Sequence, residues 1–235
     1  MAPIGTAGTG VDAVPTSTRV IPSRDRHDRG MDSRAADPWT YVVTDVELDG
    51  PWPGINSMRS FASVAVTADG VEHGRFEAVL EPLPGTAPDA ATTAWFASHP
   101  GAWEAATRDP EPVARVMERY VAWLQDLPWP RMFAAFPLAL DGIWMDYYLR
   151  RFTAYGIRQG HHEEDRLFVG GGLCLRSYAA AVTGQSTGIV DVDTLPSAWF
   201  GDVEHTHRAI DDTVGYANLL VELFRRAARG GNSDA

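Results

Sequence analysis

The hydrophobic and polar positions of the chain predict strands first and helices afterwards. Residues 39–47 form a β-branched and aromatic run of strand length, and residues 60–66 form a second. After the turn signal Asp69-Gly70, apolar and charged residues alternate over 75–81, which predicts a hairpin strand with one exposed face. We therefore expect three antiparallel strands at the start of the folded region.

Helical periodicity dominates the second half of the chain. Residues 92–103 predict a short helical or loop segment, and residues 132–136 predict a brief apolar strand. Helices are predicted at residues 112–127, after Asp141 through Ile143, Tyr147 and Leu149, at 177–182 and at 208–226. Strands followed by alternating helix and strand predict an α/β domain with a mixed sheet covered by helices.

Composition is that of an ordinary globular protein with a tail. The 235 residues are 45% hydrophobic and 22% charged, which excludes the fibrous, collagenous and wholly disordered classes. Residues 1–37 are rich in Gly, Pro, Ser and Thr without apolar periodicity, so we expect a disordered N-terminal tail, within which Met31 offers an alternative start. The folded domain is expected at 38–229 and a flexible C-terminus at 230–235.

Charge and cysteine content restrict the expected partners and compartment. The net charge of −11 argues against broad attachment to phosphate backbones, although two divalent cations would offset four of the negative charges. The single cysteine, Cys174, cannot form an internal disulfide. Residues 1–10 lack the features of a secretory signal, and no stretch approaches the roughly 20 apolar residues of a membrane span. We expect a cytoplasmic protein without a membrane partner.

Two separated groups of residues carry candidate chemistry. Asp45 and Glu47 lie two apart at the end of the first predicted strand, so their carboxylates should project from the same face. Residues 205–212 place two histidines ahead of two acids at the start of the last predicted helix. Solvent-facing acids and a helix N-terminus decorated for its dipole are the ordinary explanations. A divalent cation is the alternative, because buried carboxylates need compensation.

Three blocks of sequence, in order, resemble the DEDDh-type 3′–5′ exonucleases. They are Asp45-Val46-Glu47-Leu48-Asp49-Gly50, the run from Phe133 to Asp141, and the pattern of His207, four residues and Asp212. The resemblance covers about residues 39–228, and the family includes the polymerase proofreading exonuclease, oligoribonuclease and ribonuclease T. It implies a ribonuclease H-like α/β fold, in which a mixed five-stranded sheet has three antiparallel leading strands followed by parallel ones.

The resemblance also implies roles for particular residues. It implies that two Mg²⁺ or Mn²⁺ ions are held by Asp45, Glu47, Asp141 and Asp212, with His207 as the general base. The family's four-residue spacing selects His207 and Asp212, whereas residue physics alone leaves His205 and Asp211 open. Leu48 and Gly50 stand where relatives contact the terminal nucleotide. Trp52 is a further candidate substrate contact, because its loop should border the metal site.

These implications lead to a specific functional prediction with two alternatives. The chain is predicted to be a two-metal-dependent nuclease that hydrolyses phosphodiester bonds from the 3′ end of single-stranded DNA or RNA, releasing nucleoside 5′-monophosphates. One alternative is a 3′-end binding module of the same fold without turnover. Another is a zinc hydrolase built on residues 161–164, but adjacent residues do not present an i, i+4 ligand pair, so a polar loop is expected there. A homodimer is one expected assembly.

Overall fold

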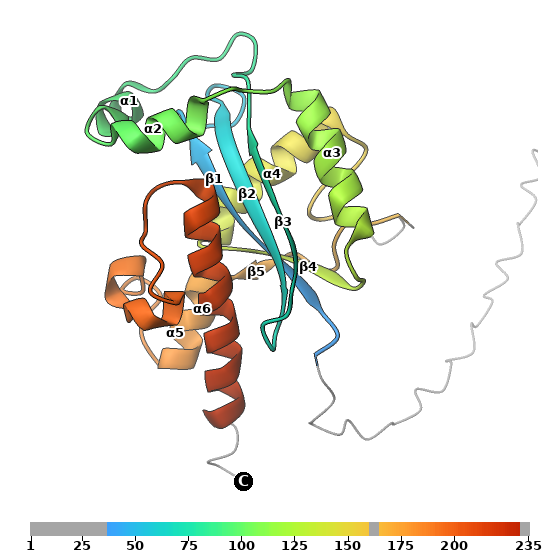
Figure 1. Cartoon of the computed structure of the whole chain (residues 1–235), viewed down its shortest axis with the longest axis vertical. Helices are drawn as coiled ribbons and strands as arrows, with labels where there is room; N and C mark the ends of the chain where they lie inside the picture. Colours follow the sequence, from blue (N-terminus) through green and yellow to red (C-terminus); the bar gives the residue numbers. More distant parts are fainter. Residues whose placement is uncertain (1–36, 160–164, 231–235) are drawn as a thin grey trace, which may run out of the picture. The chain divides into compact units, whose positions relative to one another are not determined.

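The computed structural model describes residues 37–159 and 165–230 of the chain (Figure 1). The predicted tail, apart from residue 37, lies outside the described residues. So do the alternative start at Met31, the polar loop at 161–164 and the last five residues of the predicted C-terminus.

A five-stranded mixed sheet forms the centre of the described domain. Its strand order is β3-β2-β1-β4-β5, with β1–β2 and β2–β3 antiparallel and β1–β4 and β4–β5 parallel. This arrangement confirms the predicted fold class, including the three antiparallel leading strands. The strands span Thr40–Leu48 (β1), Met58–Thr67 (β2), Glu72–Val79 (β3), Arg131–Ala135 (β4) and Leu173–Cys174 (β5).

Helices cover both faces of the sheet, and each face has its own hydrophobic cluster (Figure 1). Strand alternation explains the division, because Val42 and Val46 of β1 face one cluster while Tyr41 and Val43 face the other. The first cluster contains apolar residues of α3 and α4, and the second contains those of α5 and α6. The helices span Ala90–Ala97 (α1), Pro100–Thr107 (α2), Val113–Asp126 (α3), Leu138–Phe152 (α4), Leu175–Thr183 (α5) and Ala209–Gly230 (α6), with short 3₁₀ helices at Val192–Thr194 and Ser197–Phe200.

Helix α4 turns a different face to the core from the one that Ile143 and Tyr147 suggest. Trp144 and Tyr148 are buried, whereas Ile143 is 57% exposed and Tyr147 is half-buried. The 3.6-residue period puts residues 144 and 148 on one side, against the sheet, and leaves residues 143 and 147 on another. An exposed apolar stripe therefore runs along a helix that begins beside the predicted site.

Candidate active site

Asp45 and Glu47 lie on the face of β1 that α6 covers. Because side chains alternate along a strand, they point to the same face as Tyr41 and Val43, whose side chains belong to the cluster under α6. Directly after Glu47 the pairing of β1 with β2 shifts register, which marks a β-bulge. The two acids therefore stand at the C-terminal end of the central strand β1, beyond Val43, the last β1 residue that pairs with β4.

Helix α6 brings Asp212 to this strand pair. The hydroxyl of Thr213 donates to the carbonyl of Ala209 in its own helix at 2.5 Å and also lies 3.3 Å from the carbonyl oxygen of Ala62, the register partner of Asp45. The first turn of α6 is thereby attached to the strand residue opposite Asp45. Ligand oxygens of Asp45, Glu47 and Asp212 lie within 4.8 Å of one another. Three of the four acids implied by the resemblance therefore meet in one cluster.

Asp141 approaches the same cluster from the first turn of α4. Its side chain is buried, at 2% exposure, and one carboxylate oxygen, Oδ2, has no hydrogen-bond partner among the described residues. Asp141 lies close enough for its charge to raise the pKa of both Asp45 and Glu47. Its oxygens are not part of the tight three-residue set, so Asp141 forms one side of the site.

The electrostatics of the four acids fit a divalent cation. Burial, and then the charges of neighbouring carboxylates, raise the pKa of Asp45 and Glu47 well above the usual range. Burial also raises the pKa of Asp141 to about 8. Carboxylate oxygens are the ligands that Mg²⁺ and Mn²⁺ prefer, and a cation would compensate both the mutual repulsion and the unpartnered oxygen of Asp141. The donor set therefore fits the implied metal.

The pKa of Asp141 predicts how stability should vary with pH. Because its pKa rises on folding from 3.8 to about 8, the folded metal-free protein binds the extra proton between those values, and stability should fall as pH rises through that window. Bound Mg²⁺ or Mn²⁺ would replace the proton. We expect the metal-free Tm to be lower at about pH 8 than at about pH 5, and the Tm increase caused by Mn²⁺ to be larger at about pH 8. Asp141→Asn should weaken both effects, and an Mn²⁺ response independent of pH would contradict this account.

Two histidines stand beside Asp212 and differ in their contacts. His205 lies with Nδ1 3.0 Å from Asp212 Oδ1, and the backbone N–H of Thr206 donates to the same oxygen at 3.0 Å. The hydrogen bond with Asp212 raises the pKa of His205. Burial, followed by the charge of His205, lowers the pKa of His207. The lowered pKa favours the neutral imidazole of His207, which is the form that accepts a proton.

An aromatic wall from α1 and its C-terminal turn holds the His207 ring. Trp95 stacks on His99 at 4.0 Å between ring centroids, and the edge contact of Trp95 with His207 is 4.8 Å. His207 has a φ of +57°, in the left-handed region, so neighbouring contacts have to hold it there. The sequence pattern did not identify Trp95 or His99 as site residues, because their position relative to His207 depends on tertiary packing alone.

The turn after β1 has a structural role that the resemblance does not supply. Asp49 accepts a hydrogen bond from the N–H of Ser57 at 2.6 Å, and its carbonyl accepts from the N–H of Asp89 at 2.7 Å. The side chain of Asn56 fills the space beside Gly50, where any Cβ would overlap it. Gly50 thus permits this turn to pack, and the link through Asp89 connects the turn to the N-terminus of α1.

We expect Gly50→Ala to destabilise the fold through that overlap. The cost should be about 1–3 kcal/mol, as for other overpacked sites, because the Asn56 amide is itself held by bonds to Trp52 and Ala87. Thermal unfolding measures the effect. The matched control is Gly101→Ala, where a Cβ meets no atom within 4 Å, and which should be neutral or stabilising by up to about 1 kcal/mol. Equal Tm values for the two variants would contradict this role for Gly50.

The other predicted substrate contacts lie around the same turn. Leu48 is half-buried and packs against the cluster under α3 and α4. Trp52 is 65% exposed, and Ile55 of the same turn is 66% exposed. Asp211, the acid that the family spacing rejects, accepts from the hydroxyl of Thr206 at 2.8 Å and pairs with Arg208. Asp211 is thus engaged away from the acid cluster.

None of the helices in the part of the chain that the structure describes is long and apolar enough to cross a membrane. No protein-family model matches the sequence, and no curated protein matches it either.

Comparison with solved structures identifies the fold. E. coli Exonuclease I in complex with a dT13 oligonucleotide superposes with a TM-score of 0.58 at 16% identity, over 83% of this chain and 43% of that chain. Its zinc-bound complex with single-stranded DNA gives 0.53 at 16% identity, over 83% and 42%. The nuclease domain of 3′hExo, a DEDDh family member bound to rAMP, gives 0.56 at 9% identity, over 79% and 92%. The chain thus spans less than half of Exonuclease I but nearly all of the 3′hExo nuclease domain, and its fold is that of the DEDDh exonucleases.

Proposed function

We propose that this protein is a metal-dependent 3′–5′ exonuclease that removes nucleoside 5′-monophosphates from single-stranded DNA or RNA. The observation that carries the proposal is the meeting of acids from β1, α4 and α6 at the C-terminal end of β1, where the pKa values of Asp45, Glu47 and Asp141 are raised. The nucleic-acid ligands of the solved structures with this fold support the choice of substrate class.

The acids and His207 have different proposed roles, metal binding and proton transfer. Asp45, Glu47, Asp141 and Asp212 would hold two Mg²⁺ or Mn²⁺ ions. Such ions lower the pKa of a bound water and stabilise negative charge on the departing 3′ oxygen. His207 accepts the proton of the attacking water, for which its lowered pKa suits it. His205 and the N–H of Thr206 hold Oδ1 of Asp212, which orients that carboxylate and leaves Oδ2 for a cation.

Exposed apolar side chains on the turn after β1 and on the first turns of α4 suit the bases of a single strand. Trp52 and Ile55 stand on the turn after β1, and Leu140 and Ile143 stand on the first turns of α4, all between 43% and 66% exposed. Bases stack on such surfaces without sequence preference. Trp52 and Leu48, with the backbone at Gly50, are the proposed contacts of the 3′-terminal nucleotide.

A strand labelled at its 5′ end tests the proposal. With Mg²⁺ or Mn²⁺ the labelled strand should shorten one nucleotide at a time, and chelation by EDTA should stop the reaction. Asp45→Asn preserves the shape of the side chain and should abolish shortening. Activity equal to that of the unchanged protein would exclude the acid cluster as the catalytic centre, and would also expose a contaminating nuclease. Tight 3′-end binding without any product would instead favour the binding module.

The preferred nucleic acid is chosen by pocket contacts with the sugar. Matched single-stranded DNA, single-stranded RNA and dinucleotide substrates in the same assay distinguish the choices. Cytoplasmic location and a homodimer stay predictions, which fractionation and light scattering address.

A further inference from the structure

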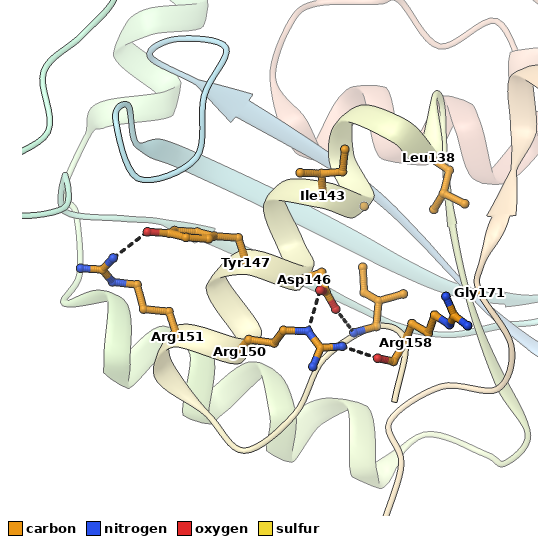
Figure 2. A pocket seen from close by; sticks show the side chains of 10 residues that line it. Leu138, Ile143, Asp146, Tyr147, Arg150, Arg151, Arg158 and Gly171 are labelled. Carbon is orange, nitrogen blue, oxygen red and sulfur yellow. Dashed lines mark hydrogen bonds and ion pairs between the residues drawn. The ribbon is translucent and has the colours of Figure 1, made fainter. Parts of the chain in front are cut away.

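A groove of about 630 Å³ lies along the outer face of α4, outside the acid cluster (Figure 2). Helix α4 provides one wall, and Ile157, Arg158 and Gly171 provide the other. Leu138, Ile143 and Ile157 make its surface apolar in part. We call it the arginine groove, because Arg150, Arg151 and Arg158 all line it.

The arginine groove is positively charged in a protein with a net charge of −11. Three arginines and one aspartate, Asp146, line it, which leaves a net charge of +2. Asp146 pairs with Arg150 at 2.7 Å and accepts a hydrogen bond from the N–H of Ile157 at 2.7 Å, so both interactions of this carboxylate are within the groove wall. Arg151 donates to the hydroxyl of Tyr147 at 2.6 Å. Within residues 37–159 and 165–230, Arg151 and Arg158 have no carboxylate at ion-pair distance.

The arginine groove lies along the helix that also carries one acid of the cluster. Gly142, which lines the groove, directly follows Asp141, and Arg151 lies nine residues after Gly142, a rise of about 14 Å. On the other side, Gly54 lies against Tyr147, since a Cβ there would be 2.7 Å from the Tyr147 hydroxyl. The turn that carries Trp52, a proposed contact of the 3′-terminal nucleotide, thus adjoins the groove.

We propose that the arginine groove binds the phosphodiester backbone of the substrate strand upstream of the bond that is cut. The inference rests on the proposed function. Guanidinium groups are good partners for phosphate oxygens, and exposed Ile143 and half-buried Tyr147 offer bases an apolar surface beside them. The groove therefore supplies local positive charge in an acidic chain. Long strands should gain affinity from it, whereas dinucleotides, which end near the acids, should not.

Fluorescence anisotropy with 5′-labelled strands tests this proposal. The measurements use the full chain with Mg²⁺ in the inactive Asp45→Asn background, so that strand length stays constant. Adding Arg151→Gln and Arg158→Gln should weaken binding of a 12-nucleotide strand roughly tenfold at 0.15 M salt, and should lower the slope of log K against log salt by about 1.4, as for two lost phosphate contacts. Dinucleotide affinity should stay within about twofold.

The matched control removes two arginines from a different pocket. Arg75 and Arg225 line a surface between the β2–β3 hairpin and α6, and each is in an exposed ion pair. Arg75→Gln with Arg225→Gln should leave the slope unchanged. The single variant Arg158→Gln shows whether the double variant is merely misfolded, because the Arg158 guanidinium has no hydrogen-bond or ion-pair partner among the residues that the structure describes. Its salt slope should change by about half as much as that of the double variant.

Several results would overturn the proposal. Equal affinities and slopes for the groove and control variants would place the strand elsewhere, and equal losses for the dinucleotide and the long strand would assign the arginines to the terminal nucleotide. The proposed function fails separately. If the unchanged protein shortens no strand while the groove variants still lose long-strand binding, the groove assignment stands without the exonuclease activity.

Discussion

Asp212→Asn is expected to slow 3′ shortening by at least roughly a thousandfold, whereas Asp211→Asn should stay within about threefold of the unchanged protein. The two residues are adjacent and chemically identical, but only Asp212 belongs to the cluster with Asp45 and Glu47. Asp212 is 4% exposed, and Asp211 is bonded to Thr206 and Arg208. Single-turnover rates with a labelled strand at saturating Mg²⁺ measure the difference.

Thermal unfolding without metal separates a catalytic effect from a folding defect. Loss of the Asp212 charge removes repulsion from the neighbouring acids but also the favourable contact with His205, so the metal-free Tm of Asp212→Asn should stay close to that of the unchanged protein. The Tm increase on adding Mn²⁺ should shrink only in the Asp212 variant. Equal rates for the two variants would remove Asp212 from the site.

His207→Ala is expected to lower the rate by about 10²–10⁴-fold, the usual contribution of a general base, and this loss should persist at any Mg²⁺ concentration. His205→Ala should behave differently. His205 holds Asp212 Oδ1 at 3.0 Å, so its loss should weaken metal affinity by about 10–100-fold, as for other residues that orient a ligand. Raising the Mg²⁺ concentration should then restore most of its rate.

A titration of rate against Mg²⁺ concentration for both histidine variants gives the measurement. The maximal rate should fall for His207→Ala, and the half-saturating Mg²⁺ concentration should rise for His205→Ala. The opposite assignment would make His205 the base, against the spacing by which we chose His207. His99→Ala, on the wall beside His207, should cause a smaller loss of maximal rate, because Trp95 still contacts the ring.

Most of the sheet could be predicted from the sequence because its strands show strong local patterns. The apolar run of β1 and the alternation in β3 follow directly from a sheet with one or both faces buried. Helix α3 was equally clear, since its apolar residues keep the helical period over 14 residues. The sequence indicated less clearly which side of α4 is buried, because apolar residues occupy both its buried and its exposed sides.

The residues of the candidate site could be predicted only where two of them lie a few positions apart in the sequence. Asp45 with Glu47 is such a pair, and so is His207 with Asp212. The aromatic wall could not be predicted, because Trp95 and His99 reach His207 across more than a hundred residues of chain. The steric role of Gly50 was also hidden, since it depends on where the Asn56 side chain folds back.

The order of the site residues along the chain has a consequence for biosynthesis. The ribosome makes β1 early, but Asp212 and His207 come late. Helix α6 docks on β1 and β2 through the hydrophobic cluster that it shares with them and through the contact of Thr213 with Ala62. A nascent chain that still lacks α6 therefore has neither the proposed base nor one of the four acids. Under the proposed function, competence for cleavage would therefore arrive only once α6 has folded onto β1 and β2.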